Sequence, residues 1–572
     1  MPMNDNGSDM KRFYFLAIAA IGLLPLPGRA GGGPLNALVV VNAASRDSRA
    51  LGAYYAQKRG IPASHLCAVK TDPRSPSISR EGFEREIRDP IRDHVARNGL
   101  SGQIHYVVLC MGIPTRVDNH NGITSALFYG FKSTLPDAPR CNVAPDSVNQ
   151  YFGSEIAYTS SAGWNRTNEP IAFVLTADSL ETAKKIVDRS VASDSTFPDG
   201  VFCLHGSPDA ARNVRHPAFP AAVRLFALHG RPSQVDANPS ASPNPGRPVV
   251  GYMTGLAYLP ESFAALDLVP GAIADHLTSC AGMLPDPCLG QSTVWDWMRL
   301  GAVASYGTVS EPCAFREKFP DPLLFFWYSR GFTAGEALAM SVRNPYQGIW
   351  VGDPLAAPFA APPSVRLLSP EPDAELEETA NLKIAAMAHQ RGAPPVFLDL
   401  YLDGIHHAPI ARPFAPVGNQ LVAEIGTNRF AYSIAPGEDL FAAVAGLAWA
   451  INSGGGGSIT AKATADRIEI SVRSPIGHGG EPLSFSVSAN RGFAPDLHVG
   501  GLPGTERLVV ENGIGRAAAA FHLGSVRDFE IEYPFDVSTL EPGPHVLSLV
   551  VRDGTAMQCQ SQVDLPFRIP PR

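Results

Sequence analysis

The residue best placed for chemistry in this sequence is a cysteine at the end of an apolar run. Within the segment 270–282 the apolar run ends at Ser279-Cys280, and Gly282 follows two positions later. A thiol at the end of a buried strand, just before a glycine turn, is where α/β folds expose a nucleophile. Such a thiol needs an imidazole to take its proton. His205, which ends another apolar run and precedes Gly206, is the candidate base. The pair predicts a catalytic Cys280–His205 dyad.

Three observations leave other roles open for Cys280 and for the cysteines that follow it. Cys288 is close enough to Cys280 to form a disulfide across one loop. His276 precedes Cys280 by four residues, and its place on the same predicted strand makes it a poor base. Cys313 is a second possible thiol nucleophile, with Glu311 nearby to orient a histidine. Cys313 is alternatively a packed or disulfide-bonded residue.

Polar residues follow the predicted strand ends at His205 and Cys280 and accompany Cys313. Arginines beside strand-end loops can hold a carboxylate or phosphate in a fork geometry. The same charges can instead form ion pairs that only organise the loops. We expect the following residues to line a site: Asp209, Arg212, Arg215, Asp275, His276, Ser279, Gln291, Tyr306, Glu311 and Cys313.

The sequence carries no pattern for a metal or a nucleotide cofactor. Asp118, His120, His205 and Asp209 are of ligand type, but no spacing supports a metal site. There is no CxxC, Walker loop or GxGxxG motif, and Gly454 to Gly457 reads as a flexible link. We expect no metal and no cofactor.

Length and charge narrow the class of protein. The chain has 572 residues, which predicts several domains, with 45% hydrophobic and 17% charged residues, as in folded proteins. The formal net charge of −8 offers no basic field, so nucleic acid is not an expected partner.

The N-terminal segment has the layout of a secretion signal. Lys11 and Arg12 precede an apolar stretch from Phe13 to Leu26, and Gly28-Arg29-Ala30 resembles a small-x-small cleavage site. Cleavage there starts the mature chain near Gly31. An uncleaved anchor is the alternative. We expect export to a periplasmic or extracellular location, with no membrane span after cleavage. Export makes disulfides possible among the eight cysteines.

Apolar strands alternate with amphipathic helices from residue 35 to residue 360. Strand-like runs occur at 38–41, 66–69, 104–110, 171–176, 201–204, 249–253 and 302–308. This alternation predicts an α/β fold with a parallel-rich sheet and helices on both faces.

The remainder has a β pattern that predicts a second domain. Hairpins that close on Asp403-Gly404 and Asp553-Gly554 resemble those of bacterial immunoglobulin-like modules, but lie too far apart for one such module. We therefore predict a signal peptide at 1–30 and a caspase-like α/β domain at 31–360. An immunoglobulin-like β-sandwich at 361–412 plus 501–572 follows, with an inserted α+β subdomain at 413–500.

Two family resemblances follow from these residues. His205-Gly206 ahead of a strand-terminal Cys280 resembles caspase-type and gingipain-type cysteine peptidases (clan CD), which implies a caspase-like core. Several segments resemble an uncharacterised exported bacterial family found with the exosortase protein-sorting system. They are 39–42 (VVVN), 59–62 (RGIP), 251–255 (GYMTG), 270–279 (PGAIADHLTS), 301–313 (GAVASYGTVSEPC), 318–320 (KFP) and 352–355 (GDPL). In that family the position of Cys280 is commonly aromatic, so Cys280 departs from its pattern.

These resemblances lead to three functional hypotheses. The first is an exported cell-envelope protein with a non-catalytic or cryptic caspase-like scaffold, linked to surface protein sorting or exopolysaccharide biology. The second is a secreted cysteine peptidase or transpeptidase that uses the Cys280–His205 dyad. The third is a carbohydrate-binding accessory with an aromatic platform of Tyr151, Phe152, Tyr158 and Trp164. The expected partners are an envelope protein or a glycan. Whether the protein is an enzyme, its substrate and its oligomeric state stay open.

Overall fold

The computed structural model describes residues 31–131, 141, 148–159, 169–236, 244–286, 288–410, 420–435, 438, 440–464, 467–472, 484–490, 497–501, 507–511, 514–524 and 528–571. The predicted signal peptide and Trp164 lie outside these residues. No helix in the described part of the chain is long and apolar enough to cross a membrane.

A ten-stranded sheet forms the centre of the N-terminal unit, in the order β2-β1-β4-β7-β13-β12-β11-β10-β8-β9. Its strands are β1 (Ala37–Asn42), β2 (Leu66–Val69), β4 (Tyr106–Cys110), β7 (Ile171–Leu175), β8 (Val201–His205), β9 (Ser233–Asp236), β10 (Val249–Thr254), β11 (Leu268–His276), β12 (Ala304–Thr308) and β13 (Gly348–Gly352). β1 runs parallel to β2 and β4, and β8, β10, β11 and β12 run parallel to one another. β13 is antiparallel to β12.

Helices cover both faces of this sheet because its strands are apolar on both sides. In β1, Val39 and Val41 pack into the same core as α2 and α6, whereas Leu38 and Val40 face the core shared with α4 and α5. The helices are α2 (Arg46–Arg59), α3 (Arg80–Phe83), α4 (Asp89–Arg97), α5 (Ile123–Phe128), α6 (Leu180–Ser193), α7 (Phe219–Leu228), α8 (Val294–Leu300), α9 (Leu323–Arg330) and α10 (Ala334–Ser341). The predicted α/β fold with helices on both faces is confirmed.

Several short elements lie outside the main sheet. The strands β3 (Ser77–Ile78), β5 (Arg116–Val117) and β6 (Asn121–Gly122) form a small sheet of their own. A π-helical turn, Glu84–Arg88, joins α3 to α4.

The C-terminal part contains two further sheets that pack face to face. One has the order β14-β16-β27 and the other β15-β29-β28-β17-β18. Leu382, Leu400 and Leu549 are among the buried residues of their common core. The strands are β14 (Ser364–Ser369), β15 (Ala374–Glu375), β16 (Thr379–Met387), β17 (Pro395–Leu402), β18 (Ile405–Pro409), β27 (Asp528–Asp536), β28 (Gly543–Asp553) and β29 (Gln560–Ile569). This β-sandwich draws on segments on either side of a long insertion, as the sequence predicts.

The inserted segment has its own helix, sheets and core. Helix α11 (Leu440–Gly454) packs Val444, Leu447 and Ile451 against the strands around it. The strands are β19 (Gln420–Ile425), β20 (Asn428–Ser433), β21 (Ile459–Thr464), β22 (Arg467–Val472), β23 (Phe485–Asn490), β24 (Leu497–Gly501), β25 (Arg507–Glu511) and β26 (Ile514–Gly524). Because β26 pairs with β22, the inserted sheets continue to Gly524 in the structure, beyond the expected end at residue 500.

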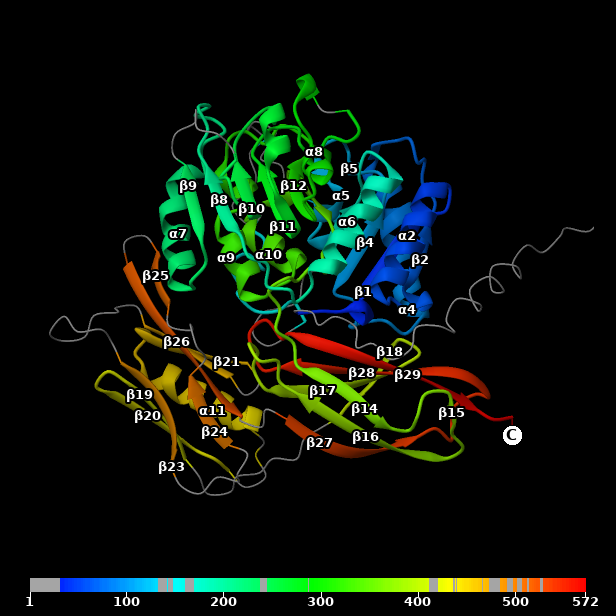
Figure 1. Cartoon of the computed structure of the whole chain (residues 1–572), viewed down its shortest axis with the longest axis vertical. Helices are drawn as coiled ribbons and strands as arrows, with labels where there is room; N and C mark the ends of the chain where they lie inside the picture. The colour runs from blue at the N-terminus through cyan, green and yellow to red at the C-terminus, as the bar shows by residue number, and fades with distance from the viewer. Residues whose placement is uncertain are drawn as a thin grey trace, which may run out of the picture.

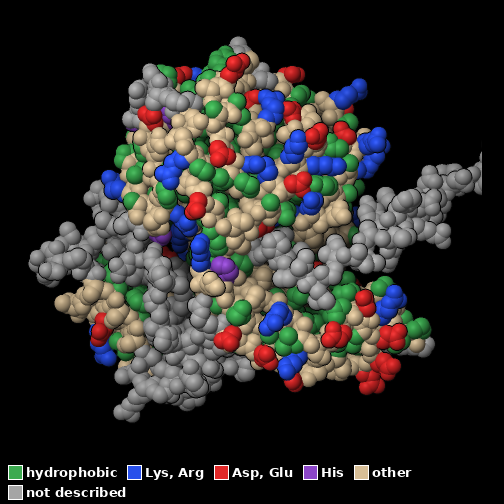
Figure 2. All heavy atoms as spheres, viewed as in Figure 1, with side chains coloured by type: hydrophobic (Ala, Val, Ile, Leu, Met, Phe, Trp, Pro, Cys, Tyr) green, Lys and Arg blue, Asp and Glu red, His purple; other side chains and the backbone are tan. Residues whose placement is uncertain are grey.

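The two larger units meet along the N-terminal ends of β1 and β4. Figure 1 shows the α/β unit above and the antiparallel sheets below, with β1 (blue) next to β28 and β29 (red). Residues 31–36 are buried at this junction. On the face drawn in Figure 2, basic and acidic side chains are interspersed over the α/β unit, so this face carries no large patch of one sign.

Candidate functional site

The carboxyl ends of β8, β10, β11 and β12 meet at one edge of the sheet because these strands are parallel. β10 lies between β8 and β11, so the strand end beside the Cys280 loop is Thr254 and not His205. Strands in a sheet are about 4.8 Å apart, which puts His205 two spacings from β11. Its ring lies 6.3 Å from that of Tyr252, and burial lowers the pKa of His205. The sequence hypothesis needs the ends of these two strands to meet at one sheet edge, and the sheet order places β10 between them.

Both predicted nucleophiles are joined to other cysteines in the structure. Cys280 pairs with Cys288 across the loop after β11, and Cys313 pairs with Cys141. The Cα atoms are 5.7 Å apart in each pair. A disulfide sulfur has no thiolate to attack a substrate. In this form of the protein neither cysteine can act as the nucleophile, and the loop-disulfide alternative describes Cys280.

The four remaining cysteines are unsuited to nucleophilic chemistry. Cys67, Cys110, Cys203 and Cys559 are free and buried. Burial raises the pKa of Cys67 and of Cys203 to about 12, and it raises the pKa of Cys110 and Cys559 further. Reactive thiols instead have a lowered pKa and some exposure.

Hydrogen bonds hold the Cys280 loop in place. The side-chain oxygen of Gln291 accepts hydrogen bonds from Thr278 Oγ1 (2.6 Å) and from the Cys280 amide (3.2 Å). Arg212 Nε donates to Thr278 Oγ1 at 3.1 Å. Thr308 Oγ1 lies 3.0 and 2.9 Å from the carbonyl oxygens of Thr278 and of the half-buried Ser279. The predicted polar residues do come together here, but their bonds are to one another.

His276 is a structural residue whose tautomer is set by its neighbours. Trp297 Nε1 donates to Nδ1 at 2.8 Å, so Nδ1 must be unprotonated. Nε2 lies 3.1 Å from the Ser292 carbonyl oxygen, to which it can only donate. Burial lowers the pKa of His276 to about 4. Both ring nitrogens are therefore used in a neutral ring, and His276 is not available as a base.

Charged residues at this edge form ion pairs. Arg215 pairs with Asp275, and both side chains are buried. Burial raises the pKa of Asp275, and Arg215 opposes that shift. Asp275 Oδ1 has no hydrogen-bond partner among the residues that the structure describes. Arg212 pairs with Asp209. The loop-organising alternative therefore accounts for both arginines.

Tyr306 and Glu311 also act within the chain. Tyr306 is buried and donates to the Lys318 carbonyl at 2.8 Å. Glu311 accepts from the Cys313 amide at 2.8 Å and so shapes the turn that carries this cysteine. Glu311 was expected to orient a histidine, but neither of these two contacts involves one.

Two members of the expected aromatic platform are not on the surface, and Phe152 is half-buried. Tyr151 and Tyr158 are buried, and their hydroxyls donate to the carbonyls of Ile156 (2.8 Å) and Glu169 (2.7 Å). The rings pack edge to face at 5.0 Å. These two residues belong to the core, which corrects the sequence hypothesis for them. Within the described ranges, no group of three or more His, Cys, Asp or Glu residues could hold a metal ion.

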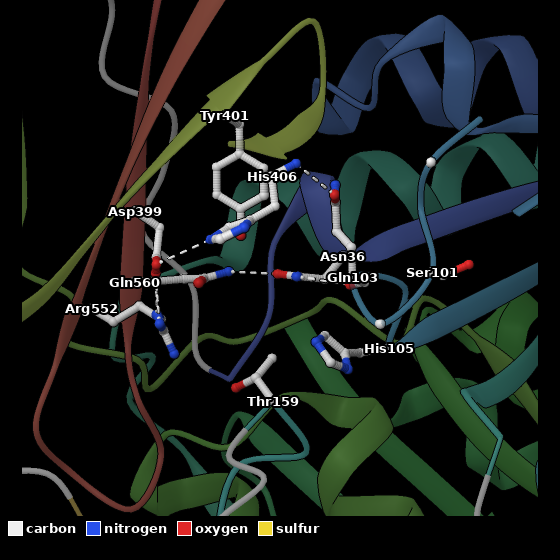
Figure 3. A pocket seen from close by; sticks show the side chains of 12 residues that line it. Asn36, Ser101, Gln103, His105, Thr159, Asp399, Tyr401, His406, Arg552 and Gln560 are labelled. Atoms are coloured by element: carbon white, nitrogen blue, oxygen red, sulfur yellow. Dashed lines mark hydrogen bonds and ion pairs between the residues drawn. The ribbon is translucent and has the colours of Figure 1, made fainter. Parts of the chain in front are cut away.

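A cavity of about 370 Å³ lies elsewhere, at the junction of the α/β unit and the sandwich. Figure 3 shows side chains from both units that point into it. Its lining consists of Asn36, Gly99, Ser101, Gly102, Gln103, His105, Thr159, Asp399, Tyr401, His406, Arg552 and Gln560.

The charges in this junction pocket are already matched. Asp399 accepts from Arg552 Nε (3.2 Å) and Nη2 (2.6 Å), and His406 Nε2 lies 3.5 Å from the other carboxylate oxygen. Gln103 accepts from the His406 amide at 2.8 Å, which ties the two units together. Burial raises the pKa of Tyr401 to about 12, so its hydroxyl stays protonated. The pocket presents neutral donors and acceptors around one internal ion pair.

Sequence reasoning did not find this pocket. Asp399 interrupts the apolar strand Phe397 to Leu402, and an acidic residue at a buried strand position is a usable signal. Its partner Arg552 lies far along the chain, and nothing local links the two.

No family model matches the sequence, and no curated protein matches it. Among solved structures, the chain is similar to one titled "Structure of Protease", with 10% identity, a TM-score of 0.37, and coverage of 80% of this chain and 98% of that one. It is also similar to dimeric latent PorU from Porphyromonas gingivalis, with 11% identity, a TM-score of 0.22, and coverage of 93% and 54%. Fibronectin(III)-like modules of Clostridium thermocellum CbhA align at 9% identity and a TM-score of 0.08, over 36% of this chain and 94% of the modules. At these TM-scores the likenesses carry no argument about activity.

Proposed function

We propose that this protein is an exported cell-envelope protein with a non-catalytic α/β scaffold, and that it binds a small neutral saccharide in the junction pocket. The observation that carries the proposal is the pocket itself, which is polar, lined by both units and internally charge-matched. A pocket of this volume accommodates a ligand of one or two sugar rings.

The ligand class follows from the lining. Arg552 is held by Asp399, so the pocket has no unpaired cation to attract a carboxylate or phosphate. Amide, hydroxyl and imidazole groups supply both donors and acceptors, which suits the hydroxyl groups of a sugar. Tyr401 is too buried for a sugar ring to stack on its face, so recognition is through hydrogen bonds.

Two further observations support export and the absence of thiol catalysis. Disulfides persist in oxidising compartments, and two are present among the described cysteines. The four free cysteines are buried thiols with raised pKa values. Iodoacetamide should therefore leave the native, unreduced protein unlabelled. Labelling of Cys280 in that protein, absent from Cys280→Ala, would support the peptidase alternative instead.

The binding proposal is tested by ligand-observed NMR with glucose, galactose, N-acetylglucosamine and glucuronate. We expect saturation transfer from the full chain to a neutral sugar, and a loss of at least tenfold in affinity in Arg552→Gln. Arg568→Gln is the matched control, because Arg568 is exposed on the neighbouring strand β29. Equal binding by wild type and Arg552→Gln, or binding of glucuronate alone, would contradict the proposal.

A further inference from the structure

Glu336 is a fully buried carboxylate without a cationic partner in the described structure. It lies in the first turn of α10, where Oε2 accepts from the Thr333 amide (3.0 Å) and hydroxyl (3.2 Å). Oε1 accepts from the Tyr158 amide at 2.8 Å. None of the interactions found for Glu336 among the described residues involves a lysine, arginine or histidine. A buried carboxylate normally pairs with a cation or becomes protonated.

The groups that face Glu336 are neutral ones from several elements. Tyr106 on β4 hydrogen-bonds to it, and Tyr151 and Cys559 are close enough for its charge to raise their pKa values. Burial raises the pKa of Glu336 to about 7. Among the described residues, therefore, no positive charge lies beside Glu336.

Gly31 also lies against this carboxylate. A Cβ on Gly31 would overlap both carboxylate oxygens and lie 2.5 Å from Glu336 Cδ. A Cβ lies about 2.5 Å from its own backbone nitrogen, so the Gly31 nitrogen is within about 5 Å of both oxygens. That nitrogen also donates to the Met557 carbonyl at 2.8 Å. The amide of Gly31 thus sits between the α/β unit and the sandwich.

Gly32 and Gly33 also lie where the neighbouring side chains leave no room for a Cβ. A Cβ on Gly32 would overlap the ring of Tyr106, and a Cβ on Gly33 would lie 2.7 Å from Gln560 Nε2. The three consecutive glycines therefore let the backbone pass where no side chain fits. Gly28-Arg29-Ala30, immediately before them, has the small-x-small pattern of a processing site.

We propose that hydrolysis of the Ala30–Gly31 bond creates an α-ammonium group on Gly31 that forms a buried ion pair with Glu336. Water adds across the peptide bond, Ala30 leaves with the new carboxylate, and Gly31 keeps the nitrogen, which takes up a proton. The co-reactant is a cellular endopeptidase of the signal-peptidase class. The new ammonium has three hydrogens, of which one can stay on the Met557 carbonyl and two can reach Glu336. After cleavage, this ion pair holds the α/β unit and the sandwich together.

This proposal shares the export step with the proposed function and does not depend on the junction pocket. The first test reads the N-terminus of the protein secreted by cells, by intact mass. A chain that begins at Gly31 is expected, and a chain that keeps residues 1–30 or begins elsewhere overturns the processing site.

The second test isolates the ion pair in purified protein. Chains that begin at Gly31 and at Ala30 are compared by thermal unfolding, each with Glu336 and with Glu336→Gln. Gln is accepted in a capping box, so this variant keeps the start of α10. We expect the extra alanine to lower the Tm by several degrees when Glu336 is present, and by much less in Glu336→Gln. Asp296→Asn, in the capping box of α8, is the matched control and should leave the effect of the extra alanine intact. An equal loss in the Glu336 and Glu336→Gln backgrounds would overturn the ion pair, even if secretion and sugar binding both hold.

Discussion

Arg59 at the end of α2 and Asp353 after β13 form a fully buried ion pair that joins residues 294 positions apart in sequence. The arginine also pairs with Asp194 and donates to Ser190 Oγ at 2.7 Å. Tyr55 Oη donates to the second oxygen of Asp353 at 2.7 Å. Burial acts to raise the pKa of Asp353, and Arg59 outweighs it, so the pKa is lowered. The segments around residues 59 and 353, which carry part of the family resemblance, are thus held together by one polar cluster.

Breaking this cluster should cost much of the stability of the α/β unit. Asp353→Asn removes one of the two buried carboxylates that pair with Arg59, and with it the acceptor of the Tyr55 and Ser190 hydroxyls. Removal of one partner from a buried ionic network costs about 3–5 kcal/mol. The adjacent pair Lys58–Asp188 is about half exposed, so Asp188→Asn should change the free energy of unfolding by about 1 kcal/mol or less. Urea unfolding of both variants measures the difference. Similar losses in the two would contradict the structural role of Asp353.

The two disulfides should contribute unequally to the free energy of unfolding. Cys141–Cys313 closes a loop of 172 residues, whereas Cys280–Cys288 closes one of 8. In the chain-entropy model these loops correspond to about 5 and about 2.6 kcal/mol. Cys141→Ser should therefore lower the Tm more than Cys280→Ser. Thiol titration of the denatured, unreduced protein should find four of the eight cysteines reactive. A count of eight would show that neither bridge forms.

The pH dependence of stability should report on Glu336 in the chain that keeps residue 30. Burial raises its pKa from 4.5 to about 7, so the folded state binds more protons than the unfolded state between these values. Stability then falls as pH rises from about 4.5 to 7, by on the order of 3 kcal/mol. Glu336→Gln should remove that loss, and so should cleavage before Gly31, because the ammonium lowers the pKa of the carboxyl. The free energy of unfolding measured at pH 5 and pH 7 tests both. A loss that persists in Glu336→Gln assigns it to another group.

The titration of His276 should change the free energy of unfolding with pH in the opposite direction to that of Glu336. Its pKa falls from 6.5 to about 4 because of burial, so the unfolded state binds the extra proton between these values. Its contribution to stability is complete above pH 6.5 and declines as pH falls towards 4. NMR of labelled histidine should show His276 still neutral at pH 5. A signal that titrates near pH 6.5 would mean that the ring is accessible to solvent and free to serve as a base.

Gly31→Ala should be far more disruptive than replacement of a positive-φ glycine that has open space around it. Gly31 has φ +43°, and a Cβ there overlaps the Glu336 carboxylate. Gly153 has φ +62° with open space around it, so Gly153→Ala should cost only about 1 kcal/mol from the left-handed backbone. Thermal unfolding of both variants, in the chain that keeps residue 30, compares them. Equal Tm values would show that Glu336 moves aside at no cost.

The local pattern of the sequence was sufficient for the elements and for the class of fold. Runs such as Val39-Val40-Val41 are apolar at every position, and only a strand buried on both faces satisfies that pattern. The Thr333–Glu336 capping box marks the start of α10, as the structure shows. The spacing of the two Asp-Gly hairpins correctly predicted a sandwich with a long insertion. Each of these signals lies within a few residues of the feature it specifies.

Only the tertiary structure determines which residues meet at the candidate site and which cysteines are paired. Apolar runs do not say which strands are neighbours, so the sequence placed His205 beside Cys280, whereas β10 lies between their strands. Cysteine pairing depends on distance in space, which brought Cys313 to Cys141 and left Cys203 unpaired. The junction pocket and the contact of Gly31 with Glu336 each join segments hundreds of residues apart. Burial and charge at such places are properties of the assembled fold, because no stretch of the chain carries them by itself.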